Sequence, residues 1–89
     1  MRIEKLSQTV FTPLPDGTGV LLNLDTLLYY SLNRTGSILW QQIEANNALT
    51  LDDLLRCACE RFDADEPSAR PLISEFVEKL EQFKMIRTA

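Results

Sequence analysis

The sequence predicts an α+β fold in which a three-stranded antiparallel sheet is followed by three helices. Two observations carry this prediction. Before Asn33, short apolar runs are separated by turn residues, which is typical of strands; after Asn33, apolar residues recur every three or four positions, which is typical of helices. A chain of 89 residues has the length of one domain, and no linker or internal repeat divides it. We therefore expect residues 1–89 to form a single domain.

The strands are expected at residues 7–11, 20–24 and 27–32. Asp16-Gly17 is a strong turn signal between the first two, and Asp25-Thr26 predicts a tight turn between the second and the third. Strands joined by short turns pair with their neighbours as an antiparallel meander. The third strand is therefore expected at one edge of the sheet.

The first helix is expected to begin after Asn33, because an Asn side chain can accept a backbone N–H of the first helical turn. Asn46 and Asn47 are expected to end it. Its apolar face consists of Gly36, Leu39, Trp40 and Ile43.

The second helix is expected to begin at Thr50, which forms a variant of the capping box with Asp53 in the pattern T-x-x-D. It is expected to stop near residues 62–65. Its apolar stripe consists of Leu51, Leu54, Leu55, Ala58 and Phe62.

The third helix has two candidate caps. If Asp65 is the cap, Pro67 lies in the first turn and Pro71 lies inside the helix, where a proline costs about 3 kcal/mol. If Ser68 is the cap, Pro71 falls in the first turn, where its missing N–H has no intrahelical partner to lose. We therefore expect Ser68 to be the cap.

The apolar side of the third helix covers an arc of about 140°, which is wider than one contact stripe needs. It contains Leu72, Ile73, Phe76, Val77, Leu80 and Phe83. The centres of the three helical stripes are expected to be mostly buried; they are Leu39, Trp40, Leu54, Leu55, Phe62, Phe76 and Leu80.

Few side chains of this sequence suit enzyme or metal chemistry. There is no histidine, and Cys57 and Cys59 would point about 200° apart on a helix, so they do not make the four-ligand set of a structural zinc site. Asp63, Asp65 and Glu66 lack the other parts of a calcium loop, and we interpret them as helix-terminal acids. Nucleophile–base pairs and Gly-rich phosphate loops are absent. We expect no catalytic activity, no cofactor and no metal.

The charge of the chain opposes binding to nucleic acid and to membrane surfaces, which need patches of Lys and Arg. The net charge is −4. A winged helix-turn-helix could carry this order of elements and bind DNA, but the second helix has two arginines against three acids. The sequence has neither an apolar run near ~20 residues nor a secretory signal. We expect a cytoplasmic protein, and we keep a winged-helix transcription regulator as an alternative.

The third strand carries two adjacent tyrosines, Tyr29 and Tyr30, which point to opposite faces. One face can join the core, and the other is either crowded surface or a contact for something else. An unpaired edge strand offers backbone groups to an extended peptide, and the wide apolar arc of the third helix could form the opposite wall. The candidate peptide-binding residues are Leu28, Tyr29, Tyr30, Ser31, Leu32, Ile73, Phe76, Val77 and Leu80, some of which must also serve the core.

From residue 20 to residue 86 the sequence resembles the PqqD-like family, also called RiPP recognition elements. The segments that carry the resemblance are VLLNLDTLLYYSLNRTGSILWQQI, TLDDLLRCACERFDAD and LISEFVEKLEQFKMI. The matching positions are Tyr30, Leu32, Asn33, Gly36, Trp40, Thr50, Leu54, Phe62, Asp63, Leu80 and Ile86. Two departures are Lys84, where the family usually has Gly, and residues 44–48, which lack the Asp-Gly of members that serve pyrroloquinoline quinone synthesis.

The resemblance implies a winged helix-turn-helix-like module of natural-product biosynthesis that acts as a peptide chaperone. It would bind the leader of a ribosomally made precursor peptide as an added strand, between the third strand and the third helix. It would then present the peptide to a modifying enzyme, such as a radical S-adenosylmethionine enzyme, or to a leader peptidase. A structural subunit of a larger enzyme is a further alternative, and an exposed edge could also pair with its own copy in a homodimer.

Overall fold

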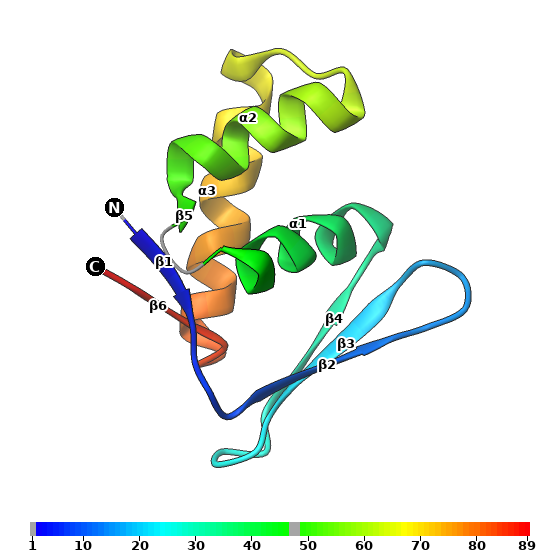
Figure 1. Cartoon of the computed structure of the whole chain (residues 1–89), viewed down its shortest axis with the longest axis vertical. Helices are drawn as coiled ribbons and strands as arrows, with labels where there is room; N and C mark the ends of the chain where they lie inside the picture. Colours follow the sequence, from blue (N-terminus) through cyan, green and yellow to red (C-terminus); the bar gives the residue numbers. More distant parts are fainter. Residues whose placement is uncertain (1, 47–48) are drawn as a thin grey trace.

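The computed structural model describes residues 2–46 and 49–89. It has the predicted α+β fold, with helices packed on one side of an antiparallel sheet and three additional short strands (Figure 1). The elements are β1 (Arg2–Lys5), β2 (Thr9–Pro13), β3 (Gly19–Asn23), β4 (Tyr29–Leu32), α1 (Arg34–Ala45), β5 (Leu49–Thr50), α2 (Leu51–Phe62), α3 (Glu66–Gln82) and β6 (Ile86–Thr88).

The predicted meander is the sheet β2-β3-β4, which is antiparallel throughout. Its strands lie within two residues of the predicted bounds. Leu21 stands opposite Phe11 on one side and Tyr30 on the other. The prediction that the third strand of the meander lies at the edge is confirmed, because β4 pairs with β3 alone among the described strands.

A second antiparallel sheet, in the order β5-β1-β6, was not predicted. Ile3 of β1 stands opposite Leu49 on one side and Thr88 on the other, and its side chain is buried. This pairing brings the two ends of the chain side by side (Figure 1). Strands this short, paired across most of the chain, leave no period in the local sequence from which they could be recognised.

The first two helices begin where the sequence predicts. Asn33 caps α1, because its Oδ1 accepts the N–H of Gly36 at 2.7 Å. Thr50 and Asp53 form the complete capping box of α2, with both hydrogen bonds at 3.1 Å. The helix α1 ends at Ala45 with Asn46 as its C-cap, whereas the predicted contribution of Asn47 lies outside the described residues. The helix α2 ends at Phe62, as expected.

The prediction that Ser68 caps the third helix is wrong. Asp65 is the cap, and its carboxylate accepts both the N–H and the hydroxyl of Ser68, at 3.4 and 3.1 Å. Pro71 therefore lies inside α3. The carbonyl that loses its partner belongs to Pro67, and both prolines are exposed, so that water can replace the missing bond. The Asp65 cap offsets part of the cost of the proline, since an N-cap contributes about 1 kcal/mol.

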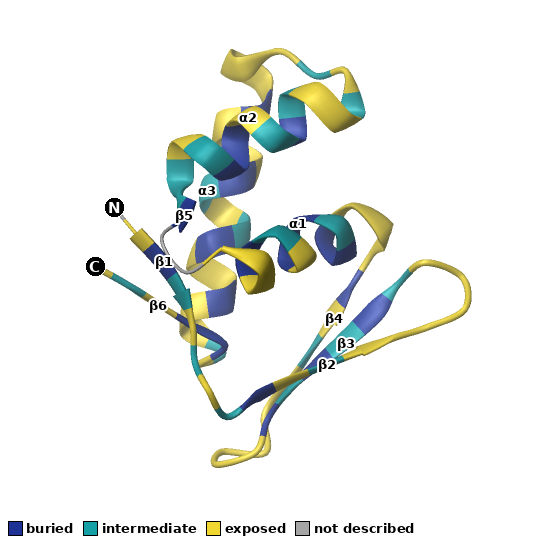
Figure 2. Ribbon diagram, in the orientation of Figure 1, coloured by how far each residue is buried: buried dark blue, intermediate teal, exposed yellow. Residues whose placement is uncertain are grey.

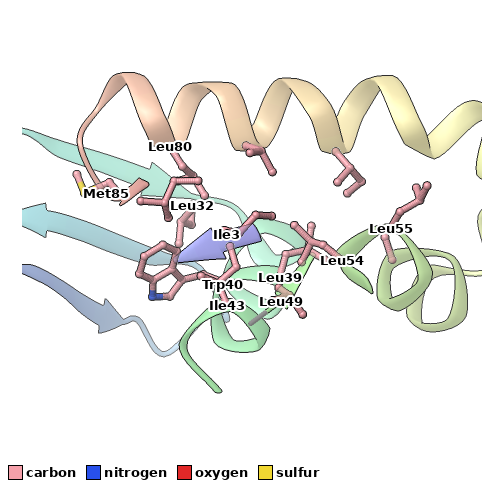
Figure 3. Packing of buried hydrophobic residues seen from close by; sticks show 14 of the residues in the cluster. Ile3, Leu32, Leu39, Trp40, Ile43, Leu49, Leu54, Leu55, Leu80 and Met85 are labelled. Carbon is pink, nitrogen blue, oxygen red and sulfur yellow. The ribbon is translucent and has the colours of Figure 1, made fainter. Parts of the chain in front are cut away.

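The core lies where α1, α2 and α3 meet the inner face of β2-β3-β4 and the buried side chains of β1, β5 and β6 (Figures 2 and 3). Trp40 of α1 is fully buried there. Of the residues predicted to be buried, Leu39, Trp40, Leu54, Leu55 and Leu80 are buried, but Phe62 and Phe76 are only partly so. Leu72, at one margin of the wide arc of α3, is 68% exposed. Only the centre of that arc packs in the core, and its margins border surface hollows.

Candidate functional site

The candidate site is the free edge of β4 together with the side of α3 that faces it. Asn23 donates its N–H to the carbonyl of Leu28 at 2.9 Å, so these two residues form a hydrogen-bonded pair next to the turn. Such pairs alternate along an antiparallel ladder. The register then directs the backbone groups of Tyr30 and Leu32 toward β3 and those of Tyr29 and Ser31 toward the open edge. Two residues of β4 thus offer N–H and C=O groups to an incoming strand.

The two tyrosines have different surroundings. Tyr30 lies on the inner face and packs against Phe83, which follows α3, with ring centroids 5.0 Å apart. Tyr29 lies on the outer face and is 66% exposed. The register places it in one row with Leu22 and Val10 across the sheet. Tyr30 is therefore the tyrosine that faces the helix.

A small cavity of about 90 Å³ lies between β4, the start of α1 and α3. It brings together Tyr30, Ser31 and Leu32 with Phe76, all of which were predicted site residues. Gly36 keeps this space open, because a Cβ at this position would lie 3.4 Å from the ring of Phe76 and closer still to its other neighbours. Sequence reasoning did not assign Gly36 or Phe83 to the site.

The other predicted wall residues have mixed positions. Ile73, Val77 and Leu80 are buried and serve the core. Phe76 is the member of this group that lines the small cavity, which together with the free edge of β4 forms the groove between β4 and α3. Leu28 precedes β4 and is exposed, whereas Leu32 is buried. Contact of these residues with a peptide stays a prediction.

A second, more apolar cavity of about 230 Å³ lies toward the start of α3. Leu72 and Ile73 of α3 line it together with Phe62 of α2 and Thr35 of α1. Since Thr35 adjoins Gly36 and Phe76 lies one turn after Leu72, the two cavities follow the same side of α3. The position of Leu72 at the margin of the over-wide apolar arc is the sequence signal that could have identified this second cavity.

The sheet beside the groove is uncharged. No residue of β2, β3 or β4 is Asp, Glu, Lys or Arg. The carboxyls with a lowered pKa lie elsewhere. Hydrogen bonds from Thr18 lower the pKa of Asp16, those from Thr50 lower the pKa of Asp53, and a hydrogen bond from Arg87 lowers the pKa of Glu4. The surroundings of β4 thus suit an extended segment with apolar side chains rather than a charged ligand.

Metal and membrane features can be stated for residues 2–46 and 49–89. Cys57 and Cys59 are free and partly buried. Within this part of the chain, no group of three or more His, Cys, Asp or Glu side chains could hold a metal ion. None of the helices there has both the length and the apolar character needed to cross a bilayer.

Comparisons with known proteins agree with the sequence resemblance. The family model described as Coenzyme PQQ synthesis protein D (PqqD) matches residues 18–86. The structure entitled "TbiB1 in Complex with the TbiA(beta) Leader Peptide" is similar with a TM-score of 0.85 and 21% identity over 97% of this chain and 96% of the other. A "Lasso peptide synthetase B1 complexed with the leader peptide" has a TM-score of 0.78 and 17% identity over 99% and 100%. No curated relative matches the sequence.

Proposed function

Since the chain belongs to the PqqD family, we propose that it binds the leader of a ribosomally synthesised precursor peptide as an additional strand on β4. The observation that carries this proposal is the unpaired, uncharged edge of β4 beside α3. The leader forms main-chain hydrogen bonds with Tyr29 and Ser31, whose backbone groups face outward. Both similar structures are described as leader-peptide complexes, which supports a leader as the ligand here.

The side chains of the bound leader alternate between two environments. Those on the inner side enter the space between Tyr30 and Phe76, and those on the outer side extend the row of Val10, Leu22 and Tyr29. Backbone bonds supply affinity with little demand on sequence, and the cavities select apolar side chains. We assign no catalytic role to this chain.

The bound peptide is then presented to a modifying enzyme, either a radical S-adenosylmethionine enzyme or a leader peptidase. The outer face of β2-β3-β4 stays accessible when the leader occupies the edge, and it can contact that enzyme. The likeness to a lasso peptide synthetase B1 favours a lasso-type precursor. We place this step in the cytoplasm, where ribosomal precursors are made. A second copy of the chain could pair with the same edge, and such a homodimer would compete with the leader.

The test compares amide hydrogen exchange of the protein with and without a synthetic leader peptide. The sequence of this peptide is taken from a short open reading frame beside the gene. The amides of Tyr29 and Ser31 should become protected when the peptide binds, because they acquire partners. The amide of Tyr30 is an internal control, since it already faces β3. Protection confined to α2 or to residues 63–66 would place the binding site elsewhere and contradict the proposal.

A further inference from the structure

Asn23, the last residue of β3, is a fully buried polar residue outside the proposed peptide contacts. Its Nδ2 donates to the carbonyl of Lys84 at 2.6 Å. Its Oδ1 accepts the backbone N–H groups of Asp25 and Thr26, at 2.9 and 3.1 Å. The partners determine the orientation of the amide, because a carbonyl can only accept and an N–H can only donate. A buried amide with its partners in place is costly to disturb.

These bonds join the two sides of the groove. Asp25 and Thr26 belong to the turn that leads into β4. The Asn23 backbone closes the same turn, since its carbonyl accepts the N–H of Leu27 at 2.8 Å and its N–H donates to Leu28 at 2.9 Å. Lys84 follows the last turn of α3. One side-chain amide therefore connects the beginning of the edge strand with the end of the helix opposite.

The end of α3 has a backbone conformation that benefits from such support. Lys84 has a φ of 60°, in the left-handed region that residues with a side chain adopt at a cost. Its N–H donates to Glu81 at 3.1 Å, and the N–H of Met85 donates to Leu80 at 2.9 Å, which together form a Schellman motif. Phe83, the residue before Lys84, carries the ring that packs against β4. The position of that ring thus depends on how Lys84 is held.

We infer that Asn23 is a positioning residue, whose amide sets the separation between β4 and α3 and thereby determines which leader side chains fit between them. This inference rests on the proposed binding of a leader. Without the bond to Lys84, the β3–β4 hairpin loses its own side-chain bond to the end of α3, which stays joined to the sheet through Thr9 of β2. The rings of Tyr30 and Phe83 can then move apart. The groove then binds the leader more weakly and distinguishes less well between side chains of different size.

The substitution Asn23→Asp isolates the bond to α3. An ionised Asp keeps an acceptor for the N–H groups of Asp25 and Thr26, but it presents an acceptor instead of a donor to Lys84. The matched control is Thr9→Val, which removes the buried bond from Thr9 Oγ1 to the carbonyl of Met85 at 3.0 Å. Thr9 stands opposite Asn23 on β2 and bonds to the residue after Lys84, but its side chain has no bond to the turn that leads into β4. Both variants should lose thermal stability.

The probe is a fluorescein-labelled synthetic leader from the neighbouring precursor gene, together with copies in which each apolar residue is replaced by Ala. Asn23→Asp should bind the intact leader about tenfold more weakly, a usual size for coupling between sites. It should also discriminate less between the intact leader and the Ala copies. Thr9→Val should bind within about twofold of the wild type, far less than the tenfold that 1.4 kcal/mol represents, and should keep the discrimination.

The free protein supplies a second readout. Ring-proton chemical shifts of Tyr30 and Phe83 should change in Asn23→Asp and stay constant in Thr9→Val. Affinity and discrimination equal to the wild type in Asn23→Asp would overturn the positioning role and leave leader binding intact, whereas a wild type that binds no leader would overturn both. If Asn23→Asp does not fold, Asn23→Ser takes its place, because a serine hydroxyl can cap the turn but is too short to reach Lys84.

Discussion

The two sheets of this domain differ in how their edges are protected. Sheet β5-β1-β6 has strands of two to four residues that carry Arg2, Glu4, Lys5 and Arg87. The carboxylate of Glu4 accepts from Arg87 at 2.6 and 3.2 Å, across neighbouring strands. Sheet β2-β3-β4 has strands of four or five residues without a single charge. Short strands and charged side chains are the usual protection against pairing with other chains.

This difference indicates which sheet has an edge suited to a guest peptide, and within that sheet β4 is the edge strand beside α3. The groups that make an exposed strand prone to association are the same groups that a guest peptide needs: free N–H and C=O groups and apolar side chains. Sheet β5-β1-β6, which joins the chain ends, has no proposed guest, and its charged side chains oppose pairing with other chains. The edge of β4 has no charged side chain to oppose pairing. Its Tyr29 side chain is largely exposed to solvent. The four predictions below test whether the two edges differ in function as they do in composition.

The largest effect is expected from Ser31→Pro, which removes an outward N–H and places a ring in the path of the leader. Leader affinity should fall about 100-fold or more, as measured by calorimetry. Thr88→Pro is the matched control, because the Arg2–Ala89 hydrogen bonds and the register direct the N–H of Thr88 away from β1 in the other sheet. A leader that binds Ser31→Pro as well as it binds Thr88→Pro would show that β4 is not the binding edge.

The next effect concerns the two tyrosines of β4. Tyr30→Ala should weaken leader binding by about 30-fold with the fold retained, because an anchor in a groove typically contributes about 2 kcal/mol or more. Tyr29→Ala should cost only about threefold, since its side chain lies on the outer face like a rim residue. Calorimetry and circular dichroism of both variants measure binding and folding separately. A larger loss of affinity in Tyr29→Ala than in Tyr30→Ala would mean that the leader contacts the outer face of the sheet.

A stabilising change is expected where the chain passes from α3 to the other sheet. Lys84→Gly removes the cost of a left-handed backbone at a residue with a side chain. It should stabilise the fold by about 1 kcal/mol, which raises the melting temperature by roughly 4–8 °C. Leader affinity should stay unchanged, because the carbonyl that bonds to Asn23 is retained. Asp63→Gly is the control: Asp63 is also left-handed, with a φ of 52°, but Asp tolerates this region better, so the gain should be smaller. A destabilised Lys84→Gly would show that the lysine side chain itself is needed.

The smallest effect is the pH dependence of the charged sheet. The hydrogen bond and charge of Arg87 lower the pKa of Glu4. A lowered pKa in the folded state contributes stability that is present above the ordinary pKa of Glu, about 4.3, and is lost as the pH falls through the lowered value. Arg87→Met should therefore reduce the melting temperature slightly at pH 7 and less at pH 3, as thermal scans can measure. The leader affinity of Arg87→Met at pH 7 should equal that of the wild type. A loss of affinity in this variant would show that the two sheets are coupled.

Features determined by neighbouring residues could be predicted from the sequence. The Asn33 cap and the Thr50–Asp53 capping box each depend on atoms within one helical turn, and both are present as expected. The prediction failed for Ser68 because the cost of a proline was weighed without knowing that Pro71 is exposed and that the Asp65 carboxylate accepts two bonds. The edge position of β4 was predictable because consecutive strands with short turns pair in order.

The sequence by itself determined the order of the β2-β3-β4 meander and the three helices, most of their ends, the stripe around Trp40 and the membership in the PqqD family, but not the sheet β5-β1-β6. Only the tertiary structure decided that Tyr30 rather than Tyr29 faces α3, and that the buried Asn23 ties the hairpin to Lys84. The physical reason is distance along the chain. Caps and turns are satisfied within a few residues, whereas the contact of Asn23 joins residues 61 positions apart, and no local pattern encodes which distant carbonyl a buried amide will meet.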